Sequence, residues 1–140
     1  MYIRESIGLN EAKAALDAIL TEASRDGGKP AVIAVVDDKG ELICLARMDG
    51  ANPFHQTMAV RKATTAALMG LDTSVFGQMM PKMNMTMLDF GSTDICLVPG
   101  GLTVRKPGGR AVLGGIGVSG RQPGQDEELA RSGLAVIGVR

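Results

Sequence analysis

Residues 47–70 read RMDGANPFHQTMAVRKATTAALMG, and the rest of the chain is organised around them. The stretch opens as the end of a strand, turns at Asp49-Gly50 and continues from Pro53 as a helix that ends at the final glycine. Small side chains dominate one face of this predicted helix, so it can lie close against a sheet or another helix. The same stretch contains His55, the single histidine of the sequence.

The residues before this stretch predict one helix and a pair of strands. Apolar residues recur at helical spacing over residues 10–25, which predicts an amphipathic helix. The apolar run of residues 31–36 (AVIAVV) predicts a strand that is covered on both faces, and residues 41–48 predict the returning strand. The turn DDKG between them is short, so the two strands form an antiparallel hairpin.

The residues that follow the predicted central helix are less regular. Residues 73–80 predict a short third helix that ends at Pro81. Residues 82–90 (KMNMTMLDF) alternate methionines with other residues, a pattern that suits either a flexible apolar flap or an edge strand. The methionines of this segment are predicted to be apolar filling rather than metal ligands.

The last third of the chain predicts three strands and a helix. Residues 94–98 (DICLV) predict a strand, residues 102–105 continue extended, and residues 110–119 form a glycine-rich strand on which something can pack closely. A last helix runs from about residue 125 to residue 136. The predicted order, α-β-β-α-α-β-β-β-α, indicates an α/β (α+β) domain with a five-stranded, mainly antiparallel sheet and helices on one or both faces.

Composition limits the class of protein. The 140 residues predict a single domain, and 15 basic residues balance 15 acidic ones, so no general attraction to nucleic acid or an anionic membrane is expected. The first residues are too polar for a secretory signal, which predicts a cytoplasmic protein. Cys44 and Cys96 are expected to be reduced, buried thiols, and without a CxxC pair a structural zinc site is not expected.

The polar groups of the central stretch and the segment VPGGL (residues 98–102) predict one small-molecule site. His55 falls in the first turn of the central helix, where the helix dipole favours a neutral imidazole that can ligate a metal or act as a base. The alternative is a surface histidine without a role. Gly100 and Gly101 can present amide groups to an anion, or form an ordinary turn.

Three charged side chains complete this predicted site. Lys62 lies two turns after His55 on the same helix face, where it can bind a carboxylate, move a proton, extend to solvent, or pair with an acid such as Asp49 or Asp94. Arg47 and Asp49 flank the turn before the helix, as an ion pair or as groups that hold an anionic ligand.

Four motifs in order carry a family resemblance: RMDGA, the KA-x-TA core of the central helix, PGG, and GxIGVSG-x-x-x-x-QDE. With them the chain resembles the GlcG/HbpS family from its first helix to its end, as one domain over residues 1–140. The resemblance implies a profilin-like three-layer α/β/α fold and homo-oligomers built from dimers. Family members include haem-binding proteins linked to sensing or redox stress, the C-terminal domain of PduO-type proteins, and proteins encoded among catabolic genes.

Three functions remain open from the sequence. The first is a module that binds haem, another tetrapyrrole or a small anionic metabolite between the central helix and the PGG loop, with His55 as axial ligand and Lys62 or Arg47 near propionates. The second is a catabolic enzyme without a cofactor, an isomerase, tautomerase or lyase, in which Arg47, Gly100 and Gly101 hold a small carboxylate. There His55 or Lys62 moves the proton. The third is an accessory subunit without a ligand.

Overall fold

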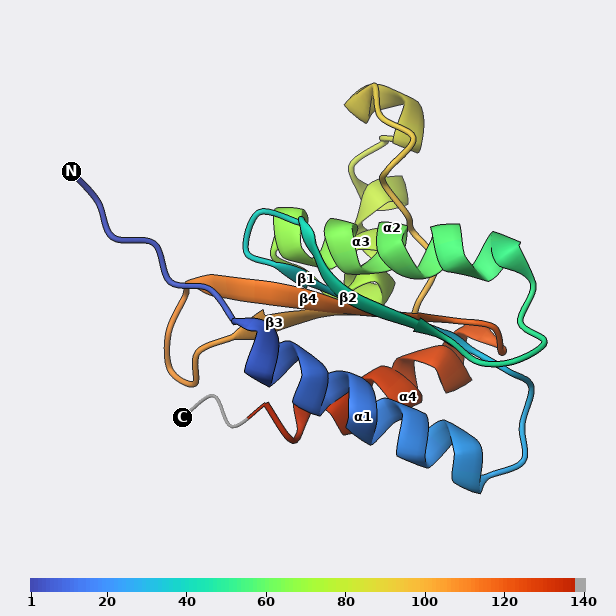
Figure 1. Ribbon diagram of the computed structural model, residues 1–140. Coiled ribbons are helices and arrows are strands. Elements are labelled where there is room, and N and C mark those ends of the chain that lie inside the picture. Colours follow the sequence, from blue (N-terminus) through green and yellow to red (C-terminus); the bar gives the residue numbers. More distant parts are fainter. Residues whose placement is uncertain (138–140) are drawn as a thin grey trace.

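The computed structural model describes residues 1–137 and shows a single sheet with helices on both faces (Figure 1). Every neighbouring pair of strands is antiparallel, and the strand order is β2-β1-β4-β3. The strands are β1 (Val32–Asp37), β2 (Leu42–Arg47), β3 (Gly101–Arg105) and β4 (Val112–Ser119). The predicted hairpin of the first two strands is confirmed.

The helices form the two outer layers of the fold (Figure 1). One face of the sheet is covered by α1 (Leu9–Arg25) and α4 (Pro123–Leu134), and the other by α2 (Pro53–Met69). The short α3 (Thr73–Lys82) follows α2 on the same side. Among the described residues, no helix is both long enough and apolar enough to cross a lipid bilayer.

The prediction of a five-stranded sheet is wrong, because the sheet has four strands. The segment 94–98 was expected to be the additional strand, but it lies against α2 and α3. The hydroxyl of Thr65 donates to the carbonyl of Asp94 at 3.3 Å and accepts from the amide of Cys96 at 2.9 Å. Ile95 is buried beside Phe76 of α3. A side chain of α2 therefore takes the hydrogen bonds that a neighbouring strand would have made.

The methionine-rich segment does not form an edge strand, and a flexible flap stays a prediction. Helix α3 continues through Pro81, which stands in its last turn, and ends at Lys82. The chain then turns and forms the short 3-10 helix η1 (Met87–Phe90). Thr86 starts η1 by accepting a hydrogen bond from the amide of Leu88.

The core depends on close packing between α2 and β4. A Cβ atom added to Gly117 would overlap the carbonyl oxygen of Ala59, and one added to Gly115 would overlap that of Ala63. The glycine-rich strand therefore accepts the backbone of α2 directly, as the sequence predicted. This contact fixes the height of α2 above the sheet and, with it, the position of the first turn of α2.

Candidate functional site

His55 stands at the start of α2, where the helix meets the end of β4. The helix begins at Pro53, and the side chain of Asn52 caps it by accepting from the amide of Phe54 at 2.9 Å. The Nδ1 atom of His55 lies 2.8 Å from Oγ of Ser119, the last residue of β4. This hydrogen bond orients the half-buried ring and leaves Nε2 as the nitrogen for a ligand or a proton.

A hollow of about 630 Å³ lies beside this ring, and we call it the His55 hollow. Its walls come from the end of α1, the loop after it, and the segment that joins β4 to α4. The lining side chains are mainly polar or charged and include no aliphatic residue: Asp26, Gly28, Lys29, His55, Gly120, Arg121, Gln122 and Gln125. Such a surface can hold a polar or anionic group against the imidazole.

Arg121 organises the wall of the His55 hollow. Its guanidinium donates to the carbonyls of Lys29 and Ala23, each at 2.9 Å, and pairs with Asp26. The hydrogen bond from Arg121 holds the pKa of the Asp26 carboxyl below its ordinary value. The side chain thus ties the end of α1 to the segment before α4.

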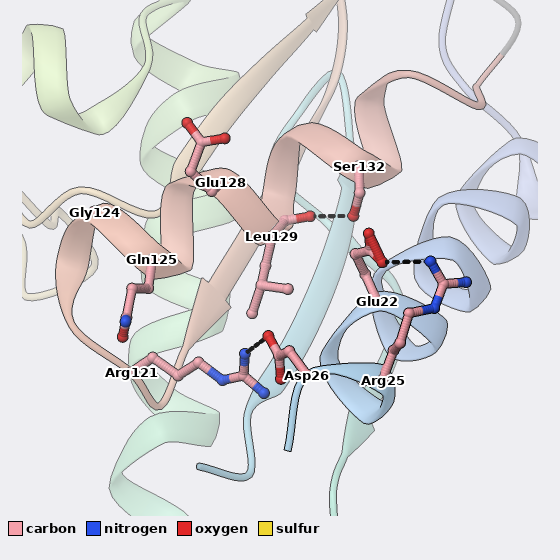
Figure 2. A pocket seen from close by; sticks show the side chains of 9 residues that line it. All are labelled: Glu22, Arg25, Asp26, Arg121, Gly124, Gln125, Glu128, Leu129 and Ser132. Atoms are coloured by element: carbon pink, nitrogen blue, oxygen red, sulfur yellow. Dashed lines mark hydrogen bonds and ion pairs between the residues drawn. The ribbon is translucent and has the colours of Figure 1, made fainter. Parts of the chain in front are cut away.

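Figure 2 shows the Arg121–Asp26 pair from a neighbouring groove between α1 and α4, the α1–α4 groove. In that view the two side chains point toward one another across the gap between the end of α1 and the start of α4. Asp26, Arg121 and Gln125 line both the groove and the His55 hollow. The ion pair is therefore part of a wall that the two depressions share.

Replacing Arg121 by alanine is expected to lower the free energy of unfolding by about 2 kcal/mol, because two carbonyls and a carboxylate lose a charged donor. Arg25→Ala is the matched control, since Arg25 is 71% exposed and pairs with Glu22 on the surface. That change should cost less than about 0.5 kcal/mol. Chemical denaturation of both variants measures the difference, and equal losses would contradict the role given to Arg121.

Lys62 is buried and paired with Asp126, which the sequence pattern did not indicate as its partner. Its side chain is 2% exposed, and its Nζ lies 3.2 Å from Oδ2 of Asp126 and donates to the carbonyl of Val118 at 2.9 Å. The predicted partners Asp49 and Asp94 are wrong. The other carboxylate oxygen of Asp126 accepts from the amide of Arg121 at 3.0 Å.

The PGG loop packs directly on Lys62. A Cβ atom at Gly100 would lie 2.8 Å from Nζ of Lys62, and one at Gly101 would overlap the carbonyl of Lys62. The amide of Gly101 already donates to the hydroxyl of Thr73 at 3.0 Å. The space expected to hold a ligand between α2 and the PGG loop is thus filled by Lys62, and the hollow lies at His55 instead.

Arg47 and Asp49 are exposed and form no ion pair with one another among residues 1–137. Arg47 ends β2 opposite Val32, and Val32 pairs on its other side with Ser119. Residues opposite one another in antiparallel strands share a face, so Arg47 lies at the same end and on the same face as Ser119. Contact between Arg47 or Asp49 and a ligand stays a prediction.

Three residues near the site were not predicted from the sequence to belong to it: Ser119, Arg121 and Asp126. Asp126 had a detectable signal, because it shares the buried helical stripe of Leu129 and Gly133, where a carboxylate needs a partner. The sequence carries no such signal for Ser119 or Arg121, because their partners His55 and Asp26 come close only in the folded chain.

These features define the class of protein as an α+β domain with a polar site at one end of an antiparallel sheet. A family model described as "Haem degrading protein HbpS-like" matches residues 7–135. The chain belongs to this HbpS-like family. Comparison with curated proteins gives no match.

Solved structures of related proteins share the fold. HbpS is 32% identical with a TM-score of 0.87, over 99% of this chain and 94% of that chain. A double mutant of Streptomyces reticuli HbpS is 31% identical with a TM-score of 0.87, over 99% and 91%. A PduOC–haem complex is 22% identical with a TM-score of 0.84, over 96% and 97%, which shows a common fold alone.

Proposed function

We propose that the protein binds haem or a related tetrapyrrole at the His55 hollow, with His55 as the axial ligand. The observation that supports this is the ring itself: Nδ1 is held by Ser119 at 2.8 Å, while the ring lines the hollow. Metal-binding histidines are commonly oriented by a hydrogen bond at their second nitrogen. Family membership and the haem complex of a protein with this fold support the same proposal.

The residues at the His55 hollow meet two needs of a tetrapyrrole. The imidazole supplies an axial donor, and Lys29 supplies a cation for carboxylates. The aromatic surface comes from Phe54, which is 61% exposed and stands edge-on to His55 with ring centroids 5.5 Å apart. A bound haem would supply an iron centre with redox chemistry, while this chain orients it and sets its exposure.

Replacing His55 by alanine is expected to abolish a saturable change in the Soret absorption when hemin is titrated into the protein. Gln56→Ala is the matched control, because Gln56 is the exposed next residue of the same helix turn. Ser119→Ala should weaken binding by about tenfold, since the ring loses the partner that orients it. A Soret change that survives His55→Ala would contradict the axial assignment.

A second candidate is a small anionic metabolite in the same hollow, and the mainly polar lining favours it. An enzyme of the isomerase, tautomerase or lyase class would need His55 for proton transfer there. The geometry supports Lys62 less well in that role, since its amine is buried against Asp126. Thermal stabilisation by small carboxylates, without any hemin response, would favour this candidate.

Further predictions accompany the proposal. We expect the protein to act in the cytoplasm, in a catabolic context, and to assemble as a homo-oligomer built from dimers. Arg47, Asp49, Gly100 and Gly101 remain predicted ligand contacts. For the two glycines, the packing on Lys62 supports an indirect contribution, through the shape of the loop.

A further inference from the structure

The segment MMPKMNMTM, residues 79–87, holds five of the nine methionines of the chain. In Figure 1 the end of α3 and the following η1 stand out from the helical layer, away from the sheet. Met80 is buried in the small cluster around Phe76. Met83 and Met87, by contrast, are 55% and 36% exposed, so core packing does not account for them.

Three of these methionines line one depression of about 400 Å³, which we call the methionine hollow. They are Met80 near the end of α3, and Met85 and Met87 from the turn that follows. The remaining lining residues are apolar or small, without an acid, a histidine or a cysteine: Gly77, Pro81, Thr86, Leu88 and Leu97. The hollow thus combines three thioethers with a lining that has no charged side chain and no imidazole.

Local hydrogen bonds fix the backbone that carries the three methionines. The amide of Met85 donates to the carbonyl of Met80 at 3.0 Å, which folds the turn back on the helix. Asn84 makes this reversal with φ of 56°, the single positive φ of a non-glycine residue in the described chain. The amide of Thr86 then donates to Asp89 at 2.7 Å and fixes the start of η1.

A thioether sulfur is a soft, neutral ligand. It suits monovalent ions such as Cu(I), whereas Mg²⁺ and Ca²⁺ require oxygen ligands. Neutral sulfur ligands do not neutralise the single positive charge of such an ion. Water can solvate that charge through the open side of the hollow. Among the described residues no group of three histidines, cysteines or acids is placed to hold a metal ion together.

The sequence predicts these methionines to be apolar filling; we propose instead that the methionine hollow binds one monovalent soft metal ion of the Cu(I) class through the thioethers of Met80, Met85 and Met87. The site would be separate from the His55 hollow, with which it shares no lining residue. It needs no covalent or redox step, because Cu(I) is bound as it is supplied.

The test is titration of the full chain with Ag(I), a redox-stable probe, followed by Cu(I) under anaerobic conditions with ascorbate. Cys44 and Cys96 are free thiols that also bind these ions, so the titration uses the variant Cys44→Ala, Cys96→Ala. With methyl-labelled methionine, the NMR signals of Met80, Met85 and Met87 should shift together and saturate at one ion per chain.

The double change Met85→Leu, Met87→Leu keeps side-chain volume and should weaken Ag(I) binding by about tenfold or more, with the thermal midpoint nearly unchanged. Met58→Leu with Met69→Leu is the matched control, because neither residue lines the hollow. Unchanged affinity in the first double variant would overturn the proposal. The proposal would also be overturned if the NMR signals of Met58 and Met69 shifted as much as those of the hollow, or if no signal shifted saturably.

Discussion

Gly117→Ala is expected to lower the free energy of unfolding by about 3 kcal/mol, or to prevent folding, because β4 has no room for a methyl group there. The added carbon would overlap the carbonyl of Ala59 and lie 2.6 Å from the amide nitrogen of Ala63. Both atoms belong to the backbone of α2, so neither can rotate away as a side chain would. The whole helix must rise from the sheet.

The matched control for this change is Gly124→Ala. Gly124 lies in the first turn of α4, and a Cβ atom there meets nothing within 4 Å. Alanine should raise stability by about 0.5 kcal/mol, since it favours the helix over the unfolded chain. Thermal melts should then separate the two variants by about 10 °C. A Gly117→Ala protein as stable as the wild type would contradict the close contact.

The same substitution links the fold to the site. Ser119 follows Gly117 by two residues on the same strand face and holds His55 at 2.8 Å. If α2 is displaced, the start of the helix moves and this hydrogen bond lengthens. A folded Gly117→Ala protein should therefore bind hemin more weakly, although residue 117 does not line the His55 hollow.

The sequence predicted those parts of the fold that depend on local signals. The hairpin of β1 and β2 follows from an apolar run and a four-residue turn, and α2 from a proline, an apolar pattern and a terminal glycine. Segment 94–98 carried the same β-prone pattern, but its backbone partner is the side chain of Thr65. A periodicity argument cannot detect such a partner, because it is set by the placement of α2.

For the candidate site, too, only the features with a local signal could be predicted from the sequence. His55 could be selected because a lone histidine at a helix start is visible in the sequence. The hydrogen bond of His55 to Ser119 and the pairing of Lys62 with Asp126 each join residues 64 positions apart, and both depend on where the helices lie against the sheet. The glycines of the PGG loop were selected for their exposed amides. In the structure their missing side chains make room for Lys62.

Lys62→Met is expected to cost about 3 to 5 kcal/mol at neutral pH, because it leaves the carboxylate of Asp126 buried without its cation. Both side chains are 2% exposed, so solvent offers little compensation. Adding Asp126→Leu removes the unpaired buried carboxylate, so the double variant should be more stable than Lys62→Met alone. Denaturant titration of the single and double variants gives the coupling between the two residues. Losses that simply add would contradict a direct ion pair.

The loss in Lys62→Met should shrink as the pH falls. In the wild type, burial raises the pKa of the Asp126 carboxyl, and the attraction of Lys62, the amide of Arg121 and His55 oppose that rise. Without Lys62 the pKa rises further. An acid whose pKa is raised by folding binds its proton more tightly in the native state, so lower pH stabilises that state.

Protonation also removes the buried charge, so the gap between wild type and Lys62→Met should be smaller near pH 5 than near pH 8, by about 1 kcal/mol or more. Lys13→Met, at an exposed position of α1, is the control and should show no such pH dependence. A constant gap would mean that Asp126 is not charged beside Lys62 at neutral pH. In that case Lys62 would fasten α2 to β4 through its hydrogen bond to Val118 alone.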